Sequence, residues 1–411
     1  MKQLFIHSSR NATQSALLEN GRLTEFSVER SEGSSLVGNI YKGRVVNVLP
    51  GMQAAFVDIG LTKNAFLYVD DVLHPNLDKQ PKVKPPIADL LKSGDELIVQ
   101  IMKEPLGGKG ARVTTHYSLP GRWLVYMPHA DYIGVSKKIE QEPERARLRQ
   151  LAEQLRGPGE GVILRTNAEG ENREALAEDL FALRALWADI AERGRRSPAP
   201  AELHHDFGLV QRIIRDVFTP DTEELVVDDE NACREAAAYL RMTAPALESR
   251  LRLYKEQTPL YDKFGINEQL DKAFQPRIWL ASGGYLVWDR TEALTVIDVN
   301  TGKYTGTVDL EETVFRTNME AAEEIARLLR LRDVGGIVIV DFIDMESEEH
   351  RQQVVQMLES AMKKDRTKSQ VLGWTRLGLL EITRKKARAN VESLFYENCA
   401  SCKGRGKIYI R

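Results

Sequence analysis

The spacing of hydrophobic residues changes along this chain, from short runs broken by glycine to a longer strand–helix–strand pattern. At the start, alternating apolar residues on both sides of the turn dipeptide Asn20-Gly21 predict a β-hairpin. Between Gly38 and Thr115, five short apolar runs separated by glycine or proline predict a small barrel of the OB type.

Residues 116–207 mix short strands with helices, and a mixed pattern continues to about residue 276. Apolar residues at helical spacing predict helices at 142–155 and 174–193. The proline-rich segment 197–202 predicts an exposed linker. Further predicted elements are a helix at 209–218, a strand at 224–227 and a helix at 231–241.

The following part of the chain predicts a βαβ unit. Two apolar strands, 294–300 and 336–343, flank a long amphipathic helix at 310–332. Strands connected in this way are parallel and close together, so their carboxyl ends meet at one edge of the sheet. Open α/β sheets usually bind their ligands at that edge. Each strand carries one aspartate near this end, Asp298 and Asp341.

The paired aspartates suggest a metal site. Two carboxylates in an apolar setting repel each other unless one takes up a proton or a cation lies between them. Asn300 follows Asp298 by two residues and therefore lies on the same face of the strand. Hard oxygen ligands of this kind suit Mg²⁺ or Mn²⁺, which can polarise a phosphoryl oxygen and supply a bound hydroxide.

The residues alone also allow a structural interpretation. Each aspartate could cap a loop or a neighbouring helix, and the pattern does not decide between a cap and a metal ligand. By alternation Asp344 lies on the other face of its strand, and we predict that it is the N-cap of a helix beginning near Glu346.

Composition narrows the class of protein. A length of 411 residues predicts two to four domains, and 42% hydrophobic with 28% charged residues is typical of a globular protein. A net charge of -3 gives no global signal for nucleic acid, so any such signal must be local. The N-terminus soon becomes polar, and no apolar stretch approaches the about 20 residues that span a bilayer. We therefore expect a cytoplasmic protein.

The three cysteines do not form a secreted disulfide framework. Cys399 and Cys402, in a Cys-x-x-Cys sequence followed by glycine, are typical of two ligands of a tetrahedral Zn²⁺. A symmetric partner chain could supply the other two ligands. The alternative is a redox motif, but no thioredoxin-like strand and helix surround it. Cys233 lies in a predicted helix and is expected to be an inert thiol.

The motifs around the paired aspartates are similar to those of a known family. Ile297-Asp-Val-Asn-Thr-Gly, the helix motif beginning at Thr317 and the run from Leu329 to Met345 closely resemble the endoribonuclease family RNase E/RNase G, with the RNase G branch favoured. The similarity covers essentially the whole chain. It implies hydrolysis of single-stranded RNA by metal-activated water in RNA processing and decay, leaving 5′-phosphate and 3′-hydroxyl ends. It also implies a preference for 5′-monophosphorylated substrates.

The resemblance assigns roles to individual residues. Asp298 and Asp341 would bind the catalytic Mg²⁺, and Asn300 would assist at the scissile phosphate. The remaining implied contacts are Phe56, Phe66 and Lys109 with RNA, Val125, Arg165 and Thr166 with the 5′-phosphate, and Cys399 and Cys402 with a zinc shared in a homodimer.

Several of these assignments depend on the resemblance. Taken alone, Phe56 and Phe66 could belong to the barrel core, and Lys109 could be an ordinary loop lysine. Arg165 and Thr166 could be a plain surface pair, although a guanidinium beside a hydroxyl suits a phosphate monoester. Lys368 stands where the RNase E branch has arginine, which leaves its role open.

The resemblance also implies a multidomain α/β layout. It consists of an RNase H-like domain (1–36 and 208–276), an OB-type RNA-binding barrel (37–115), a 5′ sensor region (116–207), a DNase I-like catalytic domain (277–395) and a zinc link (396–411). The RNase H-like part is expected to be structural, because its segments carry no evident acidic cluster. The rival hypothesis is a non-catalytic RNA-binding or assembly protein, but the intact Asp298, Asn300 and Asp341 disfavour it.

Overall fold

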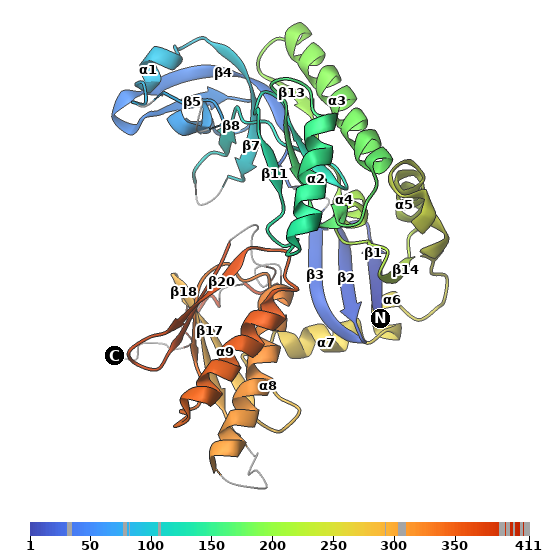
Figure 1. Ribbon diagram of the computed structural model, residues 1–411, viewed down its shortest axis with the longest axis vertical. Coiled ribbons are helices and arrows are strands. Elements are labelled where there is room, and N and C mark those ends of the chain that lie inside the picture. Colours follow the sequence, from blue (N-terminus) through green and yellow to red (C-terminus); the bar gives the residue numbers. More distant parts are fainter. Residues whose placement is uncertain are drawn as a thin grey trace. The chain divides into compact units, whose positions relative to one another are not determined.

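The computed structural model describes residues 1–30, 35–76, 80–81, 83–105, 108–291, 293–302, 310–385, 391, 395–397, 399–402 and 406. The chain divides into two compact units (Figure 1). The first comprises Met1–Val28, Pro220–Cys233 and Ser249–Arg411, and the second comprises Glu29–Thr219 and Arg234–Glu248. The layout of five domains is finer than this division and stays a prediction.

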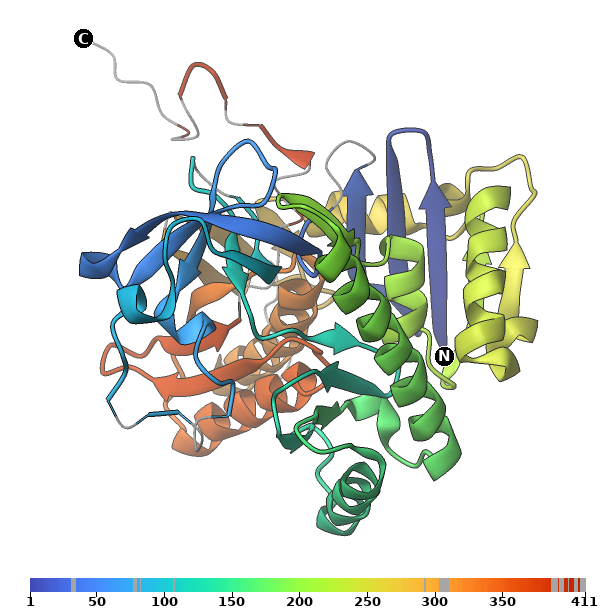
Figure 2. The same ribbon diagram turned by 90° about the horizontal axis from the view of Figure 1, so that it is seen from above.

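The first unit contains a five-stranded sheet in the order β15-β14-β1-β2-β3. Its strands are β1 (Lys2–Ser8), β2 (Ala12–Glu19), β3 (Arg22–Arg30), β14 (Thr222–Val227) and β15 (Leu251–Leu253). The predicted hairpin is confirmed, since β2 and β3 are neighbours joined at Asn20-Gly21. Strand β14 runs parallel to β1, and Figures 1 and 2 show the dark blue strands β1 to β3 side by side. The RNase H-like assignment of this sheet stays a prediction.

The first unit also contains a six-stranded mixed sheet in the order β16-β17-β18-β19-β21-β20. Its strands are β16 (Arg277–Trp279), β17 (Tyr285–Arg290), β18 (Leu294–Asn300), β19 (Gly336–Asp341), β20 (Ser369–Trp374) and β21 (Leu380–Arg384). Strands β18 and β19 are parallel neighbours joined through helix α8 (Leu310–Leu331), so the predicted βαβ unit is confirmed. Helix α9 (Glu348–Met362) follows β19.

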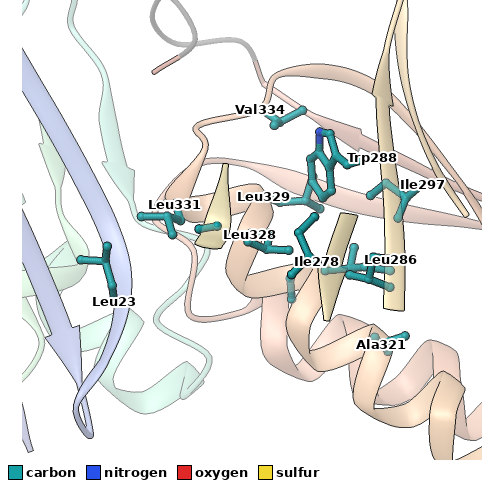
Figure 3. Close-up of a cluster of buried hydrophobic side chains, with 14 of the residues drawn as sticks. Leu23, Ile278, Leu286, Trp288, Ile297, Ala321, Leu328, Leu329, Leu331 and Val334 are labelled. Carbon is teal, nitrogen blue, oxygen red and sulfur yellow. The ribbon is translucent and has the colours of Figure 1, made fainter. Parts of the chain in front are cut away.

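One face of this sheet forms the main core of the unit. Buried residues of the strands, including Leu286, Trp288 and Ile297, pack with the buried face of α8 (Figure 3). The helix begins at the predicted residue, but it is more buried than an amphipathic pattern predicts. Arg316 and Glu323 are exposed, whereas the charged Glu324 and Arg330 are buried in ion pairs with residues of the five-stranded sheet. Since strand residues alternate between faces, the residues between the buried ones point to the opposite, open face.

The second unit contains the barrel. Strands β4 (Ile40–Leu49), β5 (Ala54–Asp58), β6 (Ala65–Tyr68), β8 (Arg112–Thr114) and β7 (Glu96–Lys103) pair in this order, and β7 pairs back with β4. The sheet therefore closes, which confirms the predicted five-stranded OB-type barrel. A short helix, α1 (Ile87–Leu90), precedes β7.

A small sheet and two helices complete the second unit. The sheet order is β11-β12-β10-β9, with β9 (Leu119–Pro120), β10 (Leu124–Met127), β11 (Ile133–Val135) and β12 (Gly161–Leu164). The two predicted helices are confirmed as α2 (Glu142–Leu155) and α3 (Arg173–Arg196). Shorter helices in the two units are α4 (Leu209–Asp216), α5 (Glu230–Thr243), α6 (Leu260–Lys263) and α7 (Ile266–Ala273).

The predicted linker at 197–202 is wrong in its second half. Ala201–His204 forms strand β13, which pairs antiparallel with β4 on the edge of the barrel sheet. Glu202 contributes further, because its carboxylate accepts a hydrogen bond of 3.1 Å from the Tyr41 hydroxyl. The prolines at 198 and 200 precede the strand, so they remove no hydrogen-bond donor from it. Composition alone does not reveal such an edge strand.

Candidate active site and RNA-binding surfaces

The open face of the six-stranded sheet carries the paired aspartates. In β18 the buried residues Ile297 and Val299 alternate with the exposed Asp298, and in β19 the exposed Asp341 follows the buried Val340. Asp298 and Asp341 are partners in the parallel ladder. Adjacent strands lie about 4.8 Å apart, so the two carboxylates occupy one small volume.

Asn300 belongs to the same group. Its side-chain nitrogen donates a hydrogen bond of 2.9 Å to an Asp298 carboxylate oxygen, which orients that carboxylate. Burial and the negative charges of Asp298 and Asp344 raise the pKa of Asp341 above its usual value. In the part of the chain that the structure describes, no Lys, Arg or His forms an ion pair with Asp298 or Asp341. Within the described residues, no cationic side chain therefore neutralises the pair.

The prediction that Asp344 caps a helix is wrong. The N-cap of α9 is Ser347, whose side chain accepts a hydrogen bond from the backbone N–H of His350. Strand β19 ends at Asp341, so alternation does not extend to Asp344. The apolar residues Phe342 and Ile343 made the strand look longer in the sequence. Asp344 is exposed, and its negative charge contributes to raising the pKa of Asp341.

The donors present at this site fit a hard divalent cation. Two exposed carboxylates and a nearby amide are oxygen donors of the kind that Mg²⁺ and Mn²⁺ prefer. Among the described residues, no three or more His, Cys, Asp or Glu side chains converge on one metal position. Mg²⁺ commonly uses only one or two carboxylates and keeps several waters, so the pair is a sufficient ligand set. The predicted loop 301–306 lies mostly outside the described residues.

The two phenylalanines of the barrel lie on its outer surface. Phe56 and Phe66 are cross-strand partners on β5 and β6, with ring centroids 6.1 Å apart in an edge-to-face arrangement. Both rings are half-buried, whereas the alternating neighbours Val57 and Leu67 fill the interior of the barrel. The structure therefore excludes the interpretation that these two rings form the barrel core.

Two lysines singled out in the sequence are exposed. Lys109 precedes β8, and the nearby Ala111 carbonyl accepts a hydrogen bond from the backbone N–H of Phe66, so this segment runs beside the phenylalanine pair. Lys368 lies just before β20 in the other unit, and its carbonyl accepts a backbone hydrogen bond from Lys385. Neither lysine forms an ion pair with a described residue.

The structure brings Val125 and Arg165 onto one face of the small sheet. Val125 pairs with Ile163, and the backbone N–H of Arg165 donates to the Trp123 carbonyl, so these four residues alternate with the buried Leu124 and Leu164. Thr166 follows Arg165 and is exposed, with its hydroxyl 2.9 Å from that of Ser136.

Arg165 is not a free cation. Its guanidinium donates to the Gly121 carbonyl at 2.6 Å and forms an ion pair of 2.6 Å with Asp216. Although burial alone would raise the pKa of Asp216, Arg215 and Arg165 lower it to about 2. A phosphate at Arg165 would therefore have to share this guanidinium with a carboxylate that already holds it.

A partly buried carboxylate supports the same strand. Asp179 of α3 accepts hydrogen bonds from three successive backbone N–H groups, those of Arg122, Trp123 and Leu124. Gly121 lies against this carboxylate, and a Cβ at that position would meet an Asp179 carboxylate oxygen at 2.4 Å, so the position requires glycine. Sequence reasoning missed both Asp179 and Asp216, since their partners lie far away along the chain and no local motif marks them.

The two terminal cysteines are both accessible. Cys399 is exposed and Cys402 is partly buried. Backbone N–H groups of Cys402 and Ser401 lower the pKa of the Cys399 thiol, and the N–H of Gly406 donates to the Cys402 sulfur at 3.3 Å. Such N–H donors favour the thiolate form that binds metal. Most of the predicted zinc link lies outside the described residues.

Comparison with known proteins gives the family of this chain. The Ribonuclease E/G family matches residues 118–387. The chain is 44% identical over 412 residues to Ribonuclease G of Haemophilus influenzae, covering 99% of this chain and 84% of that protein. It is 41% identical over 413 residues to Ribonuclease G of Escherichia coli K12, with the same coverage. Ribonuclease E of Nostoc is 40% identical over 378 residues, which are 91% of this chain and 55% of that protein.

Within the described ranges, no helix is both long and apolar enough to cross a bilayer.

The match to more than half of the chain, together with relatives that align over nearly its full length, confirms the resemblance inferred from the motifs. The protein belongs to the Ribonuclease E/G family.

Proposed function

We propose that the protein is an endoribonuclease that cleaves single-stranded RNA in RNA processing and decay, with Asp298, Asn300 and Asp341 as its catalytic residues. The observation that carries the proposal is the in-register carboxylate pair on the open sheet face, which has no cationic partner among the described residues. Relatives named as ribonucleases set the substrate class, and the site supplies the chemistry.

The carboxylates would hold Mg²⁺, which supplies Lewis-acid polarisation of the phosphate and a bound water of lowered pKa. The residues of the chain orient the reactants. Asn300 fixes the Asp298 carboxylate through one N–H and keeps a second N–H for a phosphate oxygen. Hydrolysis adds water across the bond between phosphorus and the 3′-oxygen, so one product keeps the 5′-phosphate and the other gains a 3′-hydroxyl.

The second unit would bind the RNA strand. Phe56 and Phe66 present aromatic surface on the outside of the barrel, and Lys109 supplies a nearby positive charge, which suits a single strand. Val125, Arg165 and Thr166 would hold a 5′-monophosphate, with the Arg165 guanidinium shared between the phosphate and Asp216. This arrangement supports a preference for 5′-monophosphorylated substrates.

A cleavage assay tests the proposal. A 5′-monophosphorylated single-stranded RNA should be cut in the presence of Mg²⁺, and EDTA should stop cutting while leaving binding to the barrel largely intact. The products should carry a 5′-phosphate and a 3′-hydroxyl. If the wild-type protein binds this RNA tightly but does not cut it with Mg²⁺ or Mn²⁺, it is a non-catalytic RNA-binding protein instead.

We also propose that Cys399 and Cys402 bind a structural Zn²⁺ shared by two chains in a homodimer. The N–H groups that point at the two sulfurs support this assignment. Purified protein should contain about one zinc per two chains and have the mass of a dimer by light scattering, whereas Cys399→Ser should lose zinc and dissociate. Cys233→Ser is the matched control. Zinc-free protein with thiol-dependent redox activity would favour the oxidoreductase interpretation.

A further inference from the structure

An aromatic pair lies on the same sheet face as the carboxylates, on the two strands that precede β18 in the sheet order. Trp279 of β16 pairs with Tyr285 of β17, and Tyr285 pairs with Asn300 of β18, so the three residues form one row across neighbouring strands. The Trp279 and Tyr285 ring centroids lie 5.2 Å apart at an angle of 58°. Since the row ends at Asn300, the aromatic pair is continuous with the proposed catalytic site.

Trp279 is not explained by packing within the unit. It is 54% exposed, whereas Ile278 beside it is 5% exposed and points into the core. The same sheet buries its other tryptophan, Trp288, to 4% exposure. A single exposed hydrophobic residue is ordinary, so the exposure of Trp279 gains meaning only from its position in the row that leads through Tyr285 to Asn300.

An arginine extends the aromatic pair. The Arg277 guanidinium lies 4.6 Å from the centre of the Tyr285 ring, in a cation–π contact. Arg277 pairs with Val287, which in turn pairs with Asp298, so it starts a second row that leads to the carboxylates. It is exposed, and no carboxylate within the described residues pairs with it. Its N–H groups are therefore open to a phosphate.

The chain that follows the site holds the tyrosine in place. Gly302 has a φ of +58° and passes so close to Tyr285 that a Cβ there would meet the ring at 3.0 Å and the Gly283 carbonyl oxygen at 2.5 Å. Tyr285 is thus fixed between this backbone and Arg277, and Trp279 lies outermost with its ring exposed. A fixed ring supporting an exposed one is a rigid stacking platform.

We propose that Trp279, supported by Tyr285 and Arg277, is a stacking subsite for the base of the nucleotide next to the scissile phosphate. Arg277 would contact the backbone phosphate of that nucleotide. This inference rests on the proposed function, because Asp298 and Asp341 place the scissile phosphate. Stacking uses the face of any base, so the subsite would position the strand with little sequence preference. The positive charge of Arg277, which no described carboxylate compensates, matches RNA and disfavours an apolar protein partner.

Kinetics of Trp279→Ala test the subsite. With a 5′-monophosphorylated RNA that contains one cleavage site, KM should rise about tenfold and kcat should stay within about twofold, because stacking binds the substrate and the transition state alike. Trp279→Phe should restore most of the affinity. The matched control is Phe181→Ala on α3, which removes a ring that is 74% exposed and should leave both constants unchanged.

Substrates that lack single bases locate the contact. Replacing one nucleotide at a time by an abasic one should weaken wild-type cleavage about tenfold at one position next to the cut, and Trp279→Ala should show no further loss at that position alone. Unchanged kinetics of Trp279→Ala would overturn the subsite, and so would equal additional losses at every abasic position. A change in mass of Trp279→Ala by light scattering would also overturn it, by assigning this face to a second copy of the chain.

The two proposals can fail separately. If the wild type does not cleave RNA at all, the proposed function fails. If the wild type cleaves RNA and Trp279→Ala, folded by circular dichroism, cleaves it equally well, only the stacking subsite fails. Arg277→Gln gives an independent readout. Loss of one phosphate contact should reduce the slope of the logarithm of the RNA-binding constant against the logarithm of salt concentration by about one.

Discussion

The carboxylates on the open sheet face of the first unit and those around the small sheet of the second unit differ in their partners. Asp298 and Asp341 face each other without a described cationic partner, and Asp344 adds to the repulsion. Asp216 instead lies between Arg165 and Arg215, and Asp179 accepts three backbone N–H groups. The two arginines lower the pKa of Asp216, whereas the neighbouring carboxylates raise the pKa of Asp341, and this difference supports the proposed cation site.

The largest effect is expected from the substitution Asp341→Asn, or equally Asp298→Asn, on the open sheet face. Each should reduce cleavage on the order of a thousandfold or more, because an amide is a poor Mg²⁺ ligand and one of only two carboxylates is lost. RNA binding should change little. The free energy of unfolding should stay equal or increase, since the substitution removes repulsion between like charges.

Cleavage rates, RNA titrations and urea denaturation of the same preparations measure these three quantities. Glu359→Gln removes an exposed carboxylate from α9 in the same unit and serves as the matched control. A variant of either aspartate that cuts at the wild-type rate would contradict the metal-site assignment.

Local patterns in the sequence predicted the elements that make the open face. Helix α2 has the predicted bounds, α8 begins at the predicted residue, and the parallel strands of the βαβ unit place Asp298 opposite Asp341. These elements follow from periodicity and connection rules, which act over short stretches of chain. Local pattern is therefore sufficient to place the two carboxylates side by side.

The supporting contacts of the small sheet could not be predicted in the same way. Asp216 lies in α4 and meets Arg165 from the end of β12, and Asp179 meets the residues that lead into β10. These contacts depend on how helices pack on the sheet, and a single aspartate in an amphipathic helix carries no signal of its partner. The prediction that Asp344 caps a helix was wrong for a local reason, because the apolar Phe342 and Ile343 made the strand look longer than it is.

The same substitution in the second unit should have the opposite effect on stability. Asp179→Asn replaces one accepting oxygen by a donating NH₂ group, so at least one N–H among Arg122, Trp123 and Leu124 loses its acceptor. We expect a loss of about 2 kcal/mol in the free energy of unfolding. Urea denaturation followed by tryptophan fluorescence measures it, because Trp123 itself is one of the donors. A midpoint equal to that of Asp341→Asn would remove the distinction between the two regions.

Arg165→Lys tests whether an arginine that is already paired with Asp216 also contacts the 5′-phosphate of the RNA. Lysine cannot contact the Gly121 carbonyl, Asp216 and a phosphate with the fork geometry of arginine. The ratio of kcat/KM for 5′-monophosphorylated over 5′-hydroxyl RNA should fall about tenfold. Arg149→Lys, an exposed arginine on α2, is the matched control. An unchanged ratio would show that Arg165 only stabilises the fold through Asp216.

The smallest expected effect is a difference in the acid limb of unfolding. The pKa of Asp216 is lowered from 3.8 to about 2, so the unfolded chain takes up the proton first, and the stabilisation present above about pH 4 is lost as the pH falls toward 2. Asp216→Asn should therefore flatten the pH dependence of the free energy of unfolding between about pH 4 and pH 2.5, by less than about 2 kcal/mol. Urea denaturation at a series of pH values measures this free energy. The pKa of Asp341 is raised, so the folded chain takes up its proton first, and Asp341→Asn should not flatten this limb. If both variants flatten it equally, the carboxylates of the two regions do not differ in the way that their partners indicate.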